Sequence, residues 1–158
     1  MITYVFLLLI SYFLEGIVPN ILSNIVLFFM ISAILIGSIL NIDKKNYFFI
    51  SIIFSLLYDI TYTSFAFMNT LIFIFFMIIY KKINVKNFFL LIIEYIISIM
   101  FYFLINYIST FELLNINYNY LLKTIFNSMI FNITYFIILY SIVSLVKLIK
   151  RNIISKKA

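Results

Sequence analysis

Apolar runs long enough to cross a membrane follow one another along almost the whole chain, with short polar breaks between them. A helix crosses about 30 Å of hydrocarbon with roughly 20 predominantly apolar residues. Runs that approach this length cover residues 2–18, 21–40, 47–62, 65–80, 88–108 and 121–148. We therefore predict an all-α fold, a bundle of six transmembrane helices that forms one integral membrane domain over residues 1–158.

The side-chain composition requires lipid as the solvent for most of the surface. Charged residues make up 10% of the chain, against about 25% in ordinary globular domains, and hydrophobic residues make up 66%. The 5 acidic and 11 basic residues cannot cover a surface that faces water. Binding of nucleic acid needs a basic surface patch, which no segment supplies. We expect membrane lipid, and no nucleic acid, around this protein.

The residue types that are missing limit the chemistry. The chain has no Cys and no His, which excludes disulfides, thiolate metal sites and imidazole acid–base catalysis. Two carboxylates, Asp59 and Glu94, could form a hydrolytic pair, but the span boundaries place them in different leaflets. We therefore expect a protein that is not an enzyme and that carries no metal or cofactor.

Lys and Arg residues give the orientation. Cytoplasmic loops of membrane proteins carry an excess of Lys and Arg. With six spans and a cytoplasmic C-terminus, every basic residue except Lys123 lies on the cytoplasmic side. Residues 59–64, between the third and fourth spans, carry no base, so these spans form either a tight hairpin of two full crossings or a re-entrant pair. Merging them would put two basic clusters on opposite sides, which favours six spans with both termini in the cytoplasm.

Asp59 is the acidic residue whose position most needs an explanation. A charged residue at the centre of a membrane helix costs about 2.5–3.5 kcal/mol on insertion scales. Ser51, Ser55 and Asp59 are spaced by four, so they share one helix face, which we expect to point inward. The carboxylate needs a donor. The alternatives are Lys123, the hydroxyls of residues 62 and 63, and backbone N–H groups that open the fourth helix near residue 65.

Similar polar stripes occur on three other predicted helices. They consist of Ser11 and Glu15, then Glu94, Ser98, Tyr102 and Asn106, then Thr124, Ser128 and Asn132 with Tyr135 close by. Interhelical hydrogen bonds, worth about 0.6 kcal/mol each in membranes, are their expected role. Glu15 lies near the predicted membrane edge and is expected to face lipid headgroups. Glu94 is expected to pair with a loop lysine.

The second predicted span carries a pair of small residues, Ala33 and Gly37, four positions apart. Such a pair lets two helix backbones approach closely. The approaching helix can belong to a partner protein or to the same chain, and the sequence leaves both alternatives open.

Residues 55–60 (SLLYDI) and 64–71 (SFAFMNTL) resemble the signature of the rod shape-determining protein MreD family. That signature has Gly-Leu-x-x-Asp at the end of one span and a Gly-containing start to the next. Asp59 and the downstream Asn69 match it, whereas Ser55 and Ala66 stand where the family often has Gly. In length, number of spans and basic tail, the resemblance covers the whole chain.

This resemblance implies a non-enzymatic scaffold of the cell-wall elongation complex in the bacterial inner membrane. Its partners would be MreC, MreB, and the glycan polymerase and transpeptidase of that complex. MreD is similar in architecture to the substrate-binding subunits of energy-coupling-factor vitamin transporters, so the alternative is a small-molecule-binding transport subunit. A vitamin site needs aromatic and directional polar residues around a pocket, but Tyr and Phe occur throughout this chain and do not discriminate.

Overall fold

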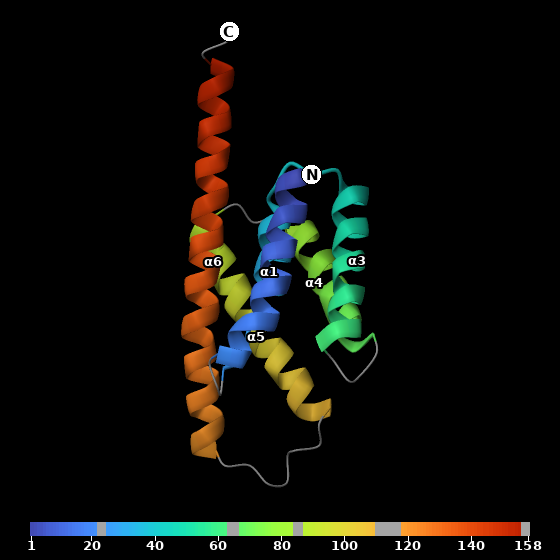
Figure 1. The fold of residues 1–158 in the computed structure, drawn as a ribbon, viewed down its shortest axis with the longest axis vertical. Coiled ribbons are helices and arrows are strands. Elements are labelled where there is room, and N and C mark those ends of the chain that lie inside the picture. The colour runs from blue at the N-terminus through green and yellow to red at the C-terminus, as the bar shows by residue number, and fades with distance from the viewer. Residues whose placement is uncertain (22–24, 63–66, 84–86, 110–117, 156–158) are drawn as a thin grey trace.

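The computed structural model describes residues 1–21, 25–62, 67–83, 87–109 and 118–155. All regular structure in these ranges is helical (Figure 1). The helices are α1 (Ile2–Ile21), α2 (Phe29–Ser38), α3 (Lys44–Tyr62), α4 (Met68–Ile83), α5 (Phe88–Ser109) and α6 (Tyr118–Ser155). The prediction of an all-α fold is confirmed.

Three of the helices contain an apolar stretch long enough to cross a membrane. These stretches are Ile2–Pro19 in α1, Phe88–Ile105 in α5 and Leu122–Ile149 in α6. The other three helices are shorter or carry more polar residues. Helix α2 has 10 residues, α4 has 16, and α3 opens with Lys44 and Lys45. Membrane crossing by all six segments stays a prediction.

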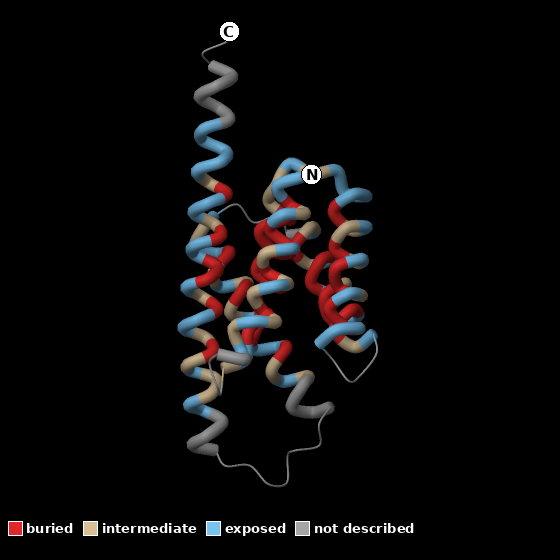
Figure 2. The backbone as a smooth tube through the Cα atoms, viewed as in Figure 1, coloured by how far each residue is buried: buried red, intermediate tan, exposed pale blue. Residues whose placement is uncertain are grey.

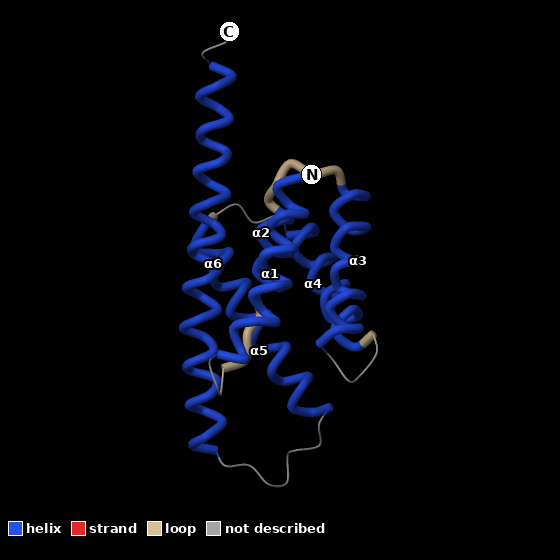
Figure 3. The backbone as a smooth tube through the Cα atoms, viewed as in Figure 1, coloured by secondary structure: helices blue, strands red, loops and turns tan. Residues whose placement is uncertain are grey.

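The second predicted span differs most from the structure. We predicted a helix over 21–40, but Ile21 ends α1, residues 25–28 are not helical, and α2 has only 10 residues (Figure 3). The ten residues of α2 rise about 15 Å, which is half of the hydrocarbon thickness. The second predicted span is therefore broken, with the non-helical residues 25–28 before a short helix. Hydropathy could not reveal the break, because both parts are equally apolar.

Every residue of α2 is buried. The helix lies at the centre of the bundle, where it packs against α1, α4, α5 and α6 (Figure 2). A helix that is apolar all round belongs in such a position. The other helices bury one face each and expose large apolar side chains on the opposite face.

The hairpin of α3 and α4 forms the most extensive helix–helix contact in the described structure. The two helices run antiparallel (Figure 1). The 19 residues of α3 rise about 28 Å, close to the hydrocarbon thickness. Residue 67, immediately before α4, has a left-handed backbone with φ of 68°.

Other helix ends lie a few residues beyond the predicted spans. Helix α1 continues past Pro19 to Ile21, and α6 continues to Ser155 instead of 148. Hydropathy locates the part of a helix that can lie in lipid, and a helix can continue into the polar interface. Helix α6 projects past the rest of the bundle, at the end where the N-terminus and the start of α3 also lie (Figure 1).

Candidate functional site: a buried polar network around a broken span

The non-helical residues 25–28 need hydrogen-bond partners, because backbone that is not helical is tolerated at membrane depth only where protein satisfies it. Asn132 of α6 supplies two of them. Its Oδ1 accepts the Phe28 N–H at 2.6 Å, and its Nδ2 donates to the Val26 carbonyl at 2.9 Å. Ser128 accepts the Val26 N–H at 2.9 Å, and the Tyr95 hydroxyl of α5 donates to the Phe28 carbonyl at 3.1 Å. Polar residues of α5 and α6 therefore stabilise the non-helical backbone at this break.

Glu15 caps the N-terminus of α2. Its two carboxylate oxygens accept the Met30 N–H at 2.8 Å and the Tyr58 hydroxyl at 2.9 Å, and the residue is 7% exposed. A carboxylate is stabilised there by the free N–H groups and by the helix dipole. The expectation that Glu15 faces lipid headgroups is wrong. The break in the second span brings a helix N-terminus beside α1, which a continuous helix would not have done.

Two lysines lie at the opposite end of α2. Lys81 Nζ of α4 donates to the Ser38 carbonyl at 3.4 Å, and Lys147 Nζ of α6 donates to the Ile39 carbonyl at 3.3 Å. Lys81 also lies 5.2 Å from the centre of the Tyr47 ring. The central helix thus has an acid at its positive end and bases at its negative end. The lysines come from two of the basic clusters that we predicted to be cytoplasmic.

Asp59 caps a second helix, α4. One of its oxygens accepts the Asn69 N–H at 3.2 Å, and the other accepts the Thr70 N–H at 2.7 Å and the Thr70 hydroxyl at 2.5 Å. The residue is 3% exposed. Backbone N–H groups that open the fourth helix are therefore donors to Asp59, although this helix begins at Met68 and not near residue 65. Lys123 is exposed on α6 and forms no ion pair with Asp59 in the described structure.

The structure brings Asn69 to Asp59 and connects it to α5, because the Tyr102 hydroxyl donates to Asn69 Oδ1. Ser51 and Ser55 share the buried face of α3 with Asp59, as predicted. Their hydroxyls donate to carbonyls of α3 itself, each at 2.7 Å, and Ser51 also bonds the Tyr4 hydroxyl of α1. They serve helix packing and do not contact the carboxylate. Ala66 lies outside the described residues.

Ala33 and Gly37 pack inside the protein. Both are buried, and a Cβ added to Gly37 would overlap the Tyr4 ring of α1, with ring atoms at 2.7 Å. The approaching helix therefore belongs to the same chain. This face of α2 is covered and is not available to a partner protein.

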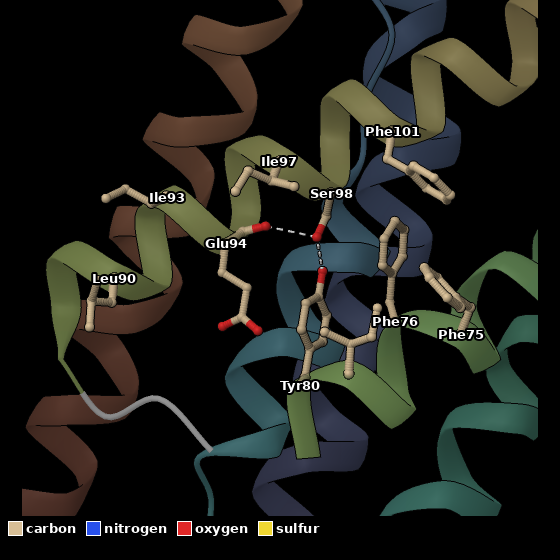
Figure 4. Close-up of a pocket in the computed structure, with 10 residues that line it drawn as sticks. Phe75, Phe76, Tyr80, Leu90, Ile93, Glu94, Ile97, Ser98 and Phe101 are labelled. Carbon is tan, nitrogen blue, oxygen red and sulfur yellow. Dashed lines mark hydrogen bonds between the residues drawn. The ribbon is translucent and has the colours of Figure 1, made fainter. Parts of the chain in front are cut away.

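Glu94 lies apart from this network, in a groove between α4 and α5 with a volume of about 540 Å³ (Figure 4). Ser98 donates to the Glu94 backbone carbonyl at 2.8 Å and accepts the Tyr80 hydroxyl at 2.5 Å. The side-chain Oε1 is buried and has no hydrogen-bond partner among the described residues. The predicted pairing with a loop lysine is absent from that part of the chain.

Sequence reasoning identified Tyr102 but missed most of the other tyrosine hydroxyls. The hydroxyls of Tyr4, Tyr58, Tyr95, Tyr102 and Tyr135 each connect two helices or a helix and the broken span. Buried Tyr residues usually find such partners. The signal was available, because Tyr102 and Tyr135 lie on the same helix faces as the predicted polar stripes.

The network links helices, and its geometry gives it a structural role. Tyr58 and Asp59 are adjacent on α3. Tyr58 donates to Glu15, which caps α2, and Asp59 itself caps α4. No group of three or more Asp and Glu residues that could hold a metal ion occurs in the described ranges. None of the protein-family models, curated proteins or solved structures compared with this chain matches it.

Proposed function

We propose that this protein is a non-enzymatic scaffold of the bacterial cell-wall elongation complex, with MreC as its direct partner. The observation that carries the proposal is the position of the residues on which the resemblance rests. Asp59 of the first motif segment binds the backbone of Asn69 and Thr70 in the second. Tyr58, beside it, binds Glu15 at the start of α2. The described residues of the two segments thus form one structural unit, the hairpin of α3 and α4. The contacts within this hairpin would explain why the signature has these residue types at this spacing.

The surface of the protein supports a role in assembly within the membrane. Large apolar side chains are exposed along α1, α3, α4, α5 and α6. Partner recognition would therefore occur through helix faces in lipid, where packing and interhelical hydrogen bonds drive association. MreB, the glycan polymerase and the transpeptidase would belong to the same complex.

The proposal includes the inner membrane, six crossings and cytoplasmic termini. The basic residues at the inner end of α2, Lys81 and Lys147, support this orientation, because they come from different clusters and reach one end of the bundle. A reporter fused after Ala158 should be active only in the cytoplasm. Activity of the fusion outside the cell would contradict the topology.

The test of function is co-purification of the detergent-solubilised protein with MreC from the same host, compared with a single-span membrane protein of unrelated function. We expect MreC to be retained and the control to be lost. Asp59→Leu should reduce the retention, because it strands the donors that open α4. Loss of MreC from the wild-type protein, together with saturable binding of a vitamin, would support the transport-subunit alternative instead.

A further inference from the structure

The groove between α4 and α5 differs from the rest of the apolar surface. Its walls are apolar and aromatic, with Phe75 and Phe76 on α4 and Phe101 on α5. Tyr80 and Ser98 bond each other and the helix backbone. The Glu94 carboxylate is thus the polar group in the groove with an unused buried acceptor atom (Figure 4).

A second hollow of about 540 Å³ lies on the other side of α5, where it faces α6 at Ile125. The two hollows share Ile97 and Phe101. Between Leu90 and Leu104, which mark their far ends on α5, the helix rises about 21 Å. We call the two hollows and the α5 residues between them the trough, and its length matches most of the path of a helix across the hydrocarbon.

The ridge of α5 between these hollows has the spacing of a helix-packing seam. The residues alternate by three and four positions and are all exposed, namely Leu90, Ile93, Ile97, Met100 and Leu104. This spacing keeps side chains facing one neighbouring helix along its whole length. Apolar spacing alone does not show whether lipid or a partner helix covers this ridge, so the choice between them depends on Glu94.

Glu94 lies six residues into α5, about 9 Å from its start at Phe88. No described residue donates a hydrogen bond to Glu94 Oε1. A carboxylate that lacks a partner at this depth is costly, and a donor of opposite charge removes the cost. A lipid headgroup amine resides at the interface, above this depth. A transmembrane helix can fix a lysine or arginine side chain at the depth of Glu94, because its backbone crosses the whole hydrocarbon.

We propose that the trough, which consists of the α5 ridge and the hollows that flank it, receives a transmembrane helix of a partner protein, whose lysine or arginine side chain binds the Glu94 carboxylate. The inference rests on the proposed function, because it takes the transmembrane helix of MreC as the occupant. Side chains of that helix fill the two hollows on either side of the α5 ridge.

The test places a photo-reactive p-benzoylphenylalanine at Ile97 in the trough or, as a control, at Ile138 on α6. The two side chains are similarly exposed, at 62% and 51%. In cells that contain MreC, we expect position 97 to cross-link to MreC at least about fivefold more than position 138, since photo-cross-linking needs direct contact. Glu94→Gln should lower the cross-link from position 97 by about fivefold or more, because it replaces a charge-assisted hydrogen bond by a neutral one. Asp43→Asn removes the same charge at an exposed site and should leave it unchanged.

The outcomes separate this inference from the proposed function. Co-purification of MreC with cross-links from position 138 but not from 97 would overturn the docking site and leave the scaffold function standing. Equal effects of Glu94→Gln and Asp43→Asn would overturn the role of the carboxylate. Cross-linking of position 97 to phospholipid alone, identified by mass spectrometry, would show that lipid fills the trough. Failure of MreC to co-purify at all would overturn both proposals.

Discussion

Asn132 should contribute more to stability than an ordinary interhelical hydrogen bond in a membrane. Its amide joins α6 to the non-helical residues 25–28, with Oδ1 on the Phe28 N–H and Nδ2 on the Val26 carbonyl. Neither backbone group has a helical partner, because the chain is not helical there. Removing the amide therefore strands the buried Phe28 N–H and the part-buried Val26 carbonyl, beside a side chain that is 0% exposed.

The expected cost follows from these two groups. A buried polar group left without a partner costs about 1–3 kcal/mol, so Asn132→Leu should lower the free energy of unfolding by about 2–6 kcal/mol. Interhelical hydrogen bonds in membranes average only about 0.6 kcal/mol, because both partners find alternatives when the helices separate. In the folded protein, the backbone groups of residues 25–28 have no helical partner that could replace the Asn132 amide, because the chain is not helical there.

The assay is reversible unfolding of the purified protein by SDS in mixed micelles, followed by circular dichroism. Asn132→Ala accompanies Asn132→Leu, since a loss seen only with leucine would report overpacking. Thr134→Val is the matched control: this exposed hydroxyl bonds only its own helix, at the Ile130 carbonyl, and we expect a change within about 0.5 kcal/mol. If both Asn132 variants lower the free energy of unfolding by no more than about 0.6 kcal/mol, the amide contributes only as much as an ordinary interhelical hydrogen bond, and the prediction is wrong.

Three further variants test other parts of the network in the same unfolding assay. Asp59→Asn should cost about 1–3 kcal/mol, because the two carboxylate oxygens accept from different N–H groups and asparagine keeps only one of these acceptors. Asp59→Leu should cost more, because it keeps neither; negligible effects of both variants would show that Asp59 does not cap α4. Gly37→Ala should destabilise the fold by about 1–3 kcal/mol, since the added Cβ overlaps the Tyr4 ring. In a protein that already carries Tyr4→Ala, Gly37→Ala should cost less; additive losses of the two variants would argue against the contact. Phe67→Gly should stabilise the protein by about 0.5–1 kcal/mol, because a left-handed backbone is strained for phenylalanine and not for glycine; a loss of stability would show that the ring contributes more than the strain costs.

The sequence alone determined the fold class and several of the buried polar residues, among them Asp59 and Ser128. Apolar runs of membrane length predict helices because a helix satisfies its own backbone in lipid, so α1, α5 and α6 could be located from hydropathy. The spacing of four between Ser51, Ser55 and Asp59 identified the buried face of α3, since residues four apart lie on one side of a helix.

Only the tertiary structure decided which groups meet. The break in the second span carries no local signal, because residues 25–28 are as apolar as α2 itself; it is stabilised by Asn132 and Ser128, more than a hundred residues away in the chain. The same break places a helix N-terminus beside Glu15, and thereby turns a residue expected at the membrane surface into a buried cap. Asp59 obtained its donors from α4 and not from Lys123, because the hairpin brings the first turn of α4 to the end of α3. Hydropathy measures how each residue prefers lipid to water, whereas these pairings depend on where helices cross.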